Sequence, residues 1–597
     1  MGSFGARCLF AYEMMVNFLK ILVAVLSGIL LAFSFAPFDE AWVVWGWMWL
    51  LLPLLWTVSG KRRSLKGFGL AWLAGMGFWV INLKWLNTVT WPGALALSAY
   101  LSAYFGFFGA FAAGSINPWR MKYERVKTIR DRAKQSFRSL GSAALLAGFW
   151  CGLEWVRGWL MTGFGWNGLG VTFAKNLILA QNAEYVGVIG LSFLPVFLSA
   201  VAVQTARRFY QQFRANEVKV LHWDFATALL LIMLSFTWGT IRLSSVTNEP
   251  KIEGRVLMVQ QDIPQFADKI LWEPSKIVEG FEELTAEGIE EVFRESAEAA
   301  QETESEEEIV EIRMPDLVIW PEACLPAYLH EQENGSMVGG PKVESVFEYI
   351  HSLGDFTFVL GMSEVRGETA VDPEVDVYNS LIMDDGNGGR QSYQKNHLVI
   401  LGEFIPDLPF LHDLYLQTTG VEFGKGLSRG TTFEPLEVDI GGQPVGVIPS
   451  VCFEDTVPRL TRKFVRHGPQ VLVNVTNDGW FQESEGSLQH FRNALFRSIE
   501  LRRPTVRCAN RGVTGVVTSA GSLVDPYSKK IRHLVNESGS YFHRGYLLAT
   551  VYIPSEGEIT LYAAFGDWFA VSGLIAGFLW VVASFFSKKS KNEKREG

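Results

Sequence analysis

The chain has 597 residues, of which 49% are hydrophobic and 19% charged, and its mean hydropathy is +0.15. This length is too great for one ordinary domain, and a net charge of −9 gives no basic field of the kind that nucleic-acid binding requires. The five cysteines are widely spaced and include no CxxC pair, so neither a disulfide framework nor a zinc site is expected.

Eight apolar runs are long enough to predict transmembrane helices, since about 20 apolar residues cross a bilayer. They cover 21–38, 41–58, 67–83, 93–114, 141–162, 186–205, 225–241 and 568–586. A cleaved signal peptide could explain the first run alone, but further runs follow it closely. The sequence therefore predicts an N-terminal membrane domain of seven spans, residues 1–242, and a C-terminal segment, 566–597, with one more span and a basic tail.

Lys and Arg gather in the segments that follow the even-numbered runs. These segments are 61–66, 117–138, 207–214 and 588–597. Because basic loops stay in the cytoplasm, the long segment 243–565 is expected on the extracytoplasmic side of the membrane. The loop 117–138 could instead bind nucleic acid, but its eight basic residues against two acids already fit a cytoplasmic loop.

One predicted span carries two charged residues, Glu154 and Arg157. Their i, i+3 spacing places them on one helix face, where the side chains can pair. Charges within spans are costly and often functional, although such a pair can also be structural at the outer end of a span. The sequence leaves a structural role and a substrate-binding role open.

The segment 243–565 has the pattern of alternating strands and helices. Strands are expected at 255–262, 316–322, 356–362, 378–384, 444–455, 471–478 and 511–519, and helices at 341–353 and 487–502. Near-continuous apolar strands are typical of sheets that are covered on both faces. This pattern predicts an α/β domain outside the membrane.

Several predicted strands end in a chemical group, and ligands of α/β sheets bind beyond the carboxyl ends of strands. Glu322 and Cys452 each follow such a strand, and Lys395 lies in a loop between them. Each residue also has an ordinary structural explanation: a turn acid, a surface lysine and a packed core cysteine. His397 suggests a Cys–His pair, but a histidine beside a lysine is more often structural.

The motifs "WPE" (320–322), "KNHL…GEF" (395–404) and "CFED" (452–455) occur in this order. The ordered set resembles the signatures of the nitrilase, or carbon–nitrogen hydrolase, superfamily. The resemblance implies an α-β-β-α sandwich with a Glu–Lys–Cys triad, which here would be Glu322, Lys395 and Cys452. Combined with the leading and trailing spans, the whole chain resembles the apolipoprotein N-acyltransferase family of bacterial membrane enzymes.

The wider resemblance extends over both predicted domains. It covers 33–39, 154–166, 260–265, 319–326, 378–380, 395–404 and 428–430. Two features depart from the family pattern: Phe453 stands where a tyrosine often follows the nucleophile, and the stretch 282–311 holds 13 acids against one base. We interpret that stretch as a solvated, partly disordered insertion.

The resemblance also implies the reaction and its partners. A phospholipid would give an acyl chain to the free α-amine of the S-diacylglyceryl cysteine of an apolipoprotein, the last step of bacterial lipoprotein maturation. The protein would lie in the cytoplasmic (inner) membrane with its catalytic domain on the periplasmic side, as a monomer that needs no cofactor and no metal.

The residues suggest the roles in such a transfer. A cysteine thiolate can hold an acyl group as a thioester, a carboxylate such as Glu322 can move the protons, and Lys395 with a backbone N–H can stabilise the oxyanion. Glu403 and Glu454 would orient Lys395 and balance its charge, and the resemblance places Asn379 near the site. Trp272 could guide lipid chains or pack in the core.

Two other classes of function fit parts of the pattern. A membrane-anchored amidase or nitrilase could hydrolyse a small amide, although one span would anchor it. A non-catalytic scaffold or transporter could carry a nitrilase-like domain, although the three triad residues are all present and the spans show no internal repeat.

Overall fold

The computed structural model describes residues 2–120, 128–216, 222–266, 269–270, 272–302, 312–367, 375–407, 409–419, 422 and 424–596. The chain divides into two compact units. One contains Met1–Arg242 together with Asp567–Gly597, and the other contains Leu243–Gly566.

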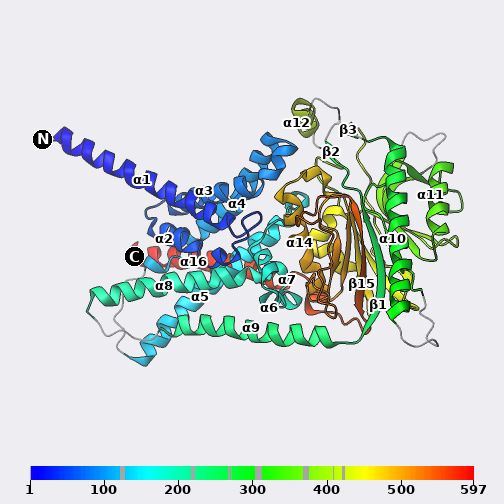
Figure 1. The fold of residues 1–597 in the computed structure, drawn as a ribbon. Coiled ribbons are helices and arrows are strands. Elements are labelled where there is room, and N and C mark those ends of the chain that lie inside the picture. The colour runs from blue at the N-terminus through cyan, green and yellow to red at the C-terminus, as the bar shows by residue number, and fades with distance from the viewer. Residues whose placement is uncertain are drawn as a thin grey trace. The chain divides into compact units, whose positions relative to one another are not determined.

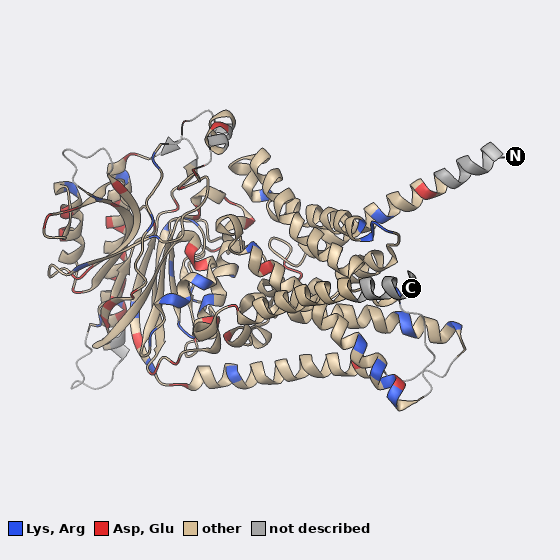
Figure 2. Cartoon of the chain, turned by 180° about the vertical axis from the view of Figure 1, so that it is seen from behind, with Lys and Arg blue, Asp and Glu red and all other residues tan. Residues whose placement is uncertain are grey.

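The first unit is helical (Figure 1). Its main helices are α1 (Gly2–Ala32), α2 (Met48–Thr57), α3 (Arg63–Asn82), α4 (Trp91–Gly114), α5 (Ile129–Arg157), α7 (Ala183–Leu191), α8 (Phe193–Arg214), α9 (Trp223–Asn248), whose last residues enter the second unit, and α16 (Trp568–Glu596). Figure 2 shows that their middles carry few charges and that basic residues gather where α5 begins and α8 ends.

The predicted number of eight spans is not confirmed. Among the described residues, six helices are long and apolar enough to cross a membrane, and α7 with α8, bent by 58°, would make a seventh. The run 41–58 forms a 3₁₀ turn, Ala41–Trp45, and the ten-residue helix α2. At 1.5 Å per residue α2 alone covers only about half of a hydrocarbon core of about 30 Å. The first span also lies earlier than predicted, because α1 ends at Ala32.

Small residues let the helices of this unit approach one another. A Cβ at Gly109 of α4 would lie 2.3 Å from the carbonyl oxygen of Gly67 in α3, and one at Gly573 of α16 would lie 2.3 Å from that of Gly148 in α5. Helices within membranes associate through such close packing, because apolar burial gives them little driving force there.

The described part of the second unit holds two large sheets. The first has the order β15-β1-β4-β7-β5-β6, with β8 on β7 and β9 on β8, and the second has the order β10-β11-β12-β13-β14. The strands of the first are β1 (Lys251–Gln260), β4 (Leu317–Ile319), β5 (Tyr328–Glu331), β6 (Met337–Gly339), β7 (Thr357–Arg366), β8 (Asp376–Asp384), β9 (Arg390–Gln394) and β15 (Gly545–Pro554). Those of the second are β10 (Leu436–Ile440), β11 (Gln443–Val451), β12 (Gln470–Thr476), β13 (Thr505–Ala509) and β14 (Gly515–Val517).

The two sheets pack face to face, with helices on the outer faces. One buried cluster joins residues of both sheets, among them Val256, Ile319, Val447 and Val473. A second cluster joins the far face of the first sheet to α10 (Pro274–Glu302) and α11 (Pro341–Ser352). Figure 1 shows α14 (Glu485–Leu501) on the other side of the strands. This layering is that of an α/β nitrilase-like domain.

The interpretation of 282–311 as a solvated, disordered insertion is wrong through residue 302. These residues belong to α10, whose Phe281, Leu284 and Ile289 are buried against the first sheet. The acids that accompany them lie on the remaining helix faces, so the stretch is an amphipathic layer helix. Residues 303–311 lie outside the described residues.

Strand positions also differ from prediction at the C-terminal end of the domain. The predicted strand 511–519 contains only the three residues of β14, and the neighbouring strand β13 ends before it. The ten-residue β15 was not predicted, although it pairs along the whole length of β1.

Candidate active site

Cys452 lies in a sharp turn after a buried strand. β11 ends at Val451, and Cys452 opens the 3₁₀ helix η6 (Cys452–Thr456) with a φ of 51°. A left-handed backbone is uncommon for a residue with a side chain, and such conformations cluster at functional sites. Asn474 of the adjacent β12 donates to the Cys452 carbonyl at 3.2 Å, which holds the turn from the side.

Glu322 reaches the same place from the first sheet, three residues after β4. Its buried carboxylate accepts a hydrogen bond from Asn379 of β8 at 2.7 Å and another from the Cys452 thiol. Gly361 of β7 makes this approach possible, since a Cβ there would lie 2.5 Å from the Glu322 Cα.

Lys395 lies between two carboxylates and is only 1% exposed. Its Nζ is 2.8 Å from Oε1 of Glu403 and 3.5 Å from Oε1 of Glu322. A buried ammonium is costly unless it is paired, so the two acids stabilise its charged form. The structure therefore brings Glu322, Lys395 and Cys452 together, as the motif order predicted.

Asn379 and Glu403 connect the members of this cluster. The Asn379 amide bridges Glu322 and Glu403, at 2.7 and 3.1 Å. The other oxygen of Glu403 accepts the backbone N–H of Val399 at 2.8 Å. Glu403 therefore contacts both the Lys395 ammonium and the loop that follows it, and a supporting role in catalysis for Glu403 and Asn379 stays a prediction.

Glu454 joins the nucleophile turn to the loop after β9. Its carboxylate is fully buried and accepts several hydrogen bonds. The donors are the backbone N–H groups of Asn396, His397 and Val451, at 2.7, 2.8 and 2.9 Å, and the hydroxyl of Tyr393, at 2.9 Å. Glu454 thus positions the backbone beside Lys395, whereas Glu403 contacts the ammonium itself.

The electrostatics of the cluster keep the Cys452 thiol protonated and increase the basicity of the Glu322 carboxylate. Burial raises the pKa of Glu322, against the opposing charge of Lys395, and burial and the Glu322 charge raise the pKa of the Cys452 thiol. Burial alone would lower the pKa of Lys395, but the charges of Glu403 and Glu322 raise it. A protonated thiol therefore faces a carboxylate of increased basicity beside a fixed positive charge.

A second cluster of charges lies behind the turn and consists of Asp455, Asp478, His490 and Arg507, each at most 1% exposed. His490 Nε2 is 2.9 Å from Asp455 and its Nδ1 is 2.7 Å from Asp478. Arg507 contacts both carboxylates, that of Asp478 at 3.1 Å. We call these four residues the rear cluster.

The rear cluster was not predicted as part of the site. Asp455 lies within "CFED", Asp478 ends the predicted strand 471–478, and the segments 477–481 and 490–512 also resemble the superfamily, but none of these four residues was assigned a role. His490 lies within α14 and Arg507 within β13, so their convergence depends on the pairing of β13 with β12, which the sequence pattern did not give.

The rear cluster predicts a loss of stability at high pH. Burial alone would lower the pKa of His490, but Asp455 and Asp478 raise it to about 9, with Arg507 opposing them. A raised histidine pKa stabilises the fold fully below the ordinary value of about 6.5, and this contribution is lost as pH rises through about 9. From pH 7 to pH 10 the free energy of unfolding should fall by about 2 kcal/mol through this group.

Thermal melting of the full-length protein in detergent at the two pH values tests this expectation. Lysines and tyrosines also titrate in this range, so the comparison is with His490→Gln. The variant should lose less stability than the wild type between pH 7 and pH 10. Equal losses in the two proteins would contradict the assignment.

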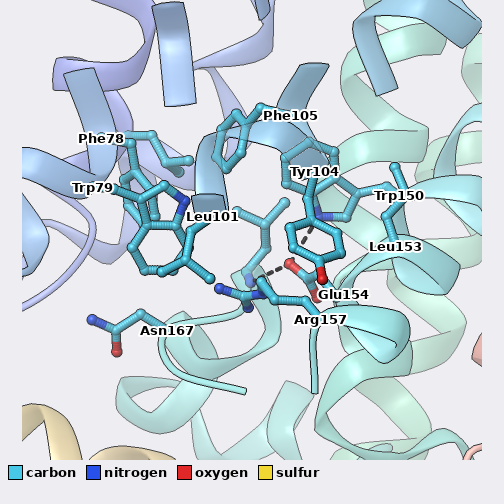
Figure 3. A pocket seen from close by; sticks show the side chains of 12 residues that line it. Phe78, Trp79, Leu101, Tyr104, Phe105, Trp150, Leu153, Glu154, Arg157 and Asn167 are labelled. Carbon is cyan, nitrogen blue, oxygen red and sulfur yellow. Dashed lines mark hydrogen bonds between the residues drawn. The ribbon is translucent and has the colours of Figure 1, made fainter. Parts of the chain in front are cut away.

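Glu154 and Arg157 lie in the first unit, at the end of α5, and line a small cavity with Trp79, Tyr104 and other residues (Figure 3). The volume open to the centre of a water molecule is about 20 Å³, which holds about one water. The two side chains share a helix face, as their spacing predicted. A substrate-binding role for them stays a prediction.

Neighbouring groups satisfy both charges of this cavity. Glu154 accepts hydrogen bonds from Trp150, Leu169 and Ser192, at 2.8, 3.0 and 2.6 Å. Arg157 donates to the carbonyl of Trp166 at 2.8 Å, and its guanidinium lies 4.9 Å from the centre of the Trp79 ring. Such contacts stabilise the end of α5 whatever else the cavity does.

Trp272 packs, half-buried, against the apolar cluster that joins α10 to the first sheet. This contact agrees with the structural alternative for Trp272. Guidance of lipid chains by its ring stays a prediction.

Two family models match the chain. The model described as apolipoprotein N-acyltransferase N-terminal domain matches residues 27–201, and the carbon–nitrogen hydrolase model matches residues 261–565. The second match covers just over half of the chain and includes the triad, Asn379 and the rear cluster.

Curated relatives match along nearly the whole chain. An apolipoprotein N-acyltransferase of Geobacter metallireducens is 28% identical over 95% of this chain and 96% of its own length. One of Chlorobaculum tepidum is 29% identical over 94% and 95% of the two chains. The order of the two matched domains is therefore that of these proteins from end to end.

Solved structures give a much weaker match. An amidase from Nesterenkonia sp. AN1, in complex with butyramide, aligns with a TM-score of 0.30 and 13% identity, over 50% of this chain and 91% of its own. Alignments at this level do not identify a function.

Proposed function

The chain belongs to the carbon–nitrogen hydrolase family, and we propose that it is a multi-pass membrane N-acyltransferase that modifies apolipoproteins. The acyl donor is a phospholipid, and the acceptor is the free α-amine of an S-diacylglyceryl cysteine at an apolipoprotein N-terminus. The observation that carries the proposal is the buried contact between Glu322, Lys395 and Cys452 in a chain whose curated relatives of equal length are named apolipoprotein N-acyltransferases.

In the first half-reaction the Cys452 thiol passes its proton to Glu322 and the sulfur attacks the ester carbonyl of the phospholipid sn-1 chain. The oxyanion that forms gains stabilisation from the Lys395 ammonium and from a backbone N–H at the start of η6. When the C–O bond breaks, Glu322 returns the proton to the leaving alkoxide. The products are a lysophospholipid and an acyl-Cys452 thioester.

In the second half-reaction the acceptor amine attacks the thioester carbonyl. Glu322 takes the proton that the amine loses, and the C–S bond breaks to leave an amide and the Cys452 thiolate. The proton on Glu322 then restores the thiol. This ping-pong sequence needs no cofactor, since one carboxylate carries the proton in both halves.

The membrane location fits both substrates, which are themselves anchored by acyl chains. We place the protein in the bacterial inner membrane, with the triad on the periplasmic side, because the basic segments 61–66, 117–138, 207–214 and 588–597 then all lie in the cytoplasm. This topology requires the run 41–58 to cross the membrane in addition to the six long helices and the bent pair of α7 and α8. In this proposal the enzyme acts as a monomer. Trp272 guides lipid chains, and Glu154 and Arg157 contribute to substrate binding at the end of α5.

The two other classes of function receive less support. A small-amide hydrolase needs one anchor, whereas the described residues hold at least six helices of spanning length. A non-catalytic scaffold has no need of a buried lysine between two glutamates, which costs desolvation energy.

Incubation of the purified full-length protein with phospholipid and a diacylated lipopeptide tests the proposal. The lipopeptide with a free α-amine should gain the mass of one acyl chain and release a lysophospholipid. An N-acetylated lipopeptide is the matched control and should gain none. Release of free fatty acid without any acylated peptide would assign the protein to the hydrolases instead.

A further inference from the structure

The geometry of the rear cluster fixes the protonation state of His490. A neutral imidazole donates a hydrogen bond at one nitrogen and accepts at the other, whereas an ionised carboxylate only accepts. Both nitrogens of His490 face carboxylate oxygens, at 2.7 and 2.9 Å. A nitrogen of Arg507 also lies 3.2 Å from Nδ1, but the shorter contact of Nδ1 with Asp478 requires a proton on Nδ1. His490 is therefore an imidazolium, and with Arg507 it balances the two carboxylates of Asp455 and Asp478.

The rear cluster is tied to the nucleophile by two routes. Asp455 belongs to η6, the turn that Cys452 opens, and His490 holds its side chain from α14. Arg507 donates to Asn474 at 2.9 Å, and Asn474 donates to the carbonyl of Cys452 at 3.2 Å. The rear cluster thus contacts the turn at two places, at Asp455 near its end and, through Asn474, at Cys452, its first residue.

The turn needs such support because its first residue is strained. The φ of Cys452 is 51°, a left-handed backbone that is unfavourable for a residue with a Cβ and persists only where neighbours hold it. Glu454 holds the turn on the side of Lys395 through the N–H of Val451. Asp455 holds it on the opposite side, where the rings of Phe453 and Phe481 also pack on His490.

We propose that His490 is a positioning residue for the nucleophile: held between Asp478 and Asp455, it locks the turn of Cys452 so that the thiol stays in contact with Glu322. Asp478 orients the imidazolium, and the bond to Asp455 transmits that orientation to the turn. The inference rests on the proposed function, since it assigns His490 a part in forming acyl-Cys452.

Two substitutions separate this role from a general contribution to stability. The amide nitrogen of glutamine occupies the place of Nε2, so His490→Gln keeps the bond to Asp455. The amide nitrogen of asparagine occupies the place of Nδ1, so His490→Asn keeps the hydrogen bond to Asp478. It loses the hydrogen bond to Asp455, which is the contact with the turn. Both variants remove the same positive charge from the cluster.

The measurement is the rate of acyl-adduct formation on the full-length protein with phospholipid, followed by intact mass, at several donor concentrations. His490→Asn should acylate about 10²-fold more slowly than wild type, a loss that a misplacement of about 1 Å can cause, with its half-saturating donor concentration unchanged. His490→Gln should retain a rate at least roughly tenfold above that of His490→Asn. Equal rates in the two variants would overturn the proposal.

A second pair of variants applies if His490→Asn does not fold. Asp455→Asn removes the charge on the turn, and Asp478→Asn removes the charge at the far side of His490; the first should acylate more slowly than the second. Equal loss in this pair also overturns the positioning role. If the wild type itself forms no adduct, the proposed function fails. If the wild type forms the adduct but the two variants acylate at equal rates, only the positioning role of His490 fails.

Discussion

Cys452→Ala is expected to abolish acyl transfer, with a fall on the order of 10⁵-fold or more in kcat, because no other group can take the place of a covalent nucleophile. The sulfur is the atom that carries the acyl group between donor and acceptor in the proposed mechanism. The substitution leaves the fold intact, since Cys452 packs at the edge of the buried cluster between the sheets rather than within it.

Intact mass after incubation with phospholipid measures this effect directly. The wild type should show an adduct that hydroxylamine removes, as expected for a thioester, and Cys452→Ala should show none. Cys508→Ala is the matched control: the Cys508 thiol is buried and donates to the Val259 and Ile319 carbonyls, both at 3.3 Å, so this variant should keep the adduct. An adduct that persists in Cys452→Ala would reject the nucleophile assignment.

Local pattern in the sequence indicated the positions of two of the three triad residues. Glu322 and Cys452 follow buried strands, and the carboxyl ends of strands are where ligand groups gather in α/β sheets. Lys395 follows β9, a short strand of mostly polar residues that periodicity does not mark. Its position came from the family motif and not from local pattern.

The rear cluster and α10 could not be predicted for opposite reasons. His490 and Arg507 meet Asp455 only because β13 lies beside β12, and strand order is a tertiary property that no local pattern encodes. In α10 the high acid content obscured the apolar face, which the sheet buries. The eight predicted spans are not all confirmed, because composition does not show that the run 41–58 is divided between a 3₁₀ turn and a short helix.

The second large effect is expected from Glu322→Gln, which should slow formation of the acyl-enzyme by about 10²–10⁴-fold. An amide of the same size can still contact Asn379 and the Lys395 ammonium, but it cannot take the thiol proton. Burial raises the pKa of Glu322, so in the wild type the acylation rate should fall as pH falls through that raised value, because protonation removes the base.

Single-turnover acylation measured against pH therefore distinguishes a proton-transfer role for Glu322 from a purely electrostatic one. The acidic decline of the wild type should be absent from Glu322→Gln, whose residual rate should instead rise with pH as hydroxide ionises the thiol. Glu434→Gln alters an exposed glutamate that pairs with Arg466 and should match the wild type throughout. If Glu322→Gln keeps the wild-type rate and its acidic decline, the proton must leave Cys452 by another group, and Glu403, which shares the Lys395 ammonium, becomes the next residue to substitute.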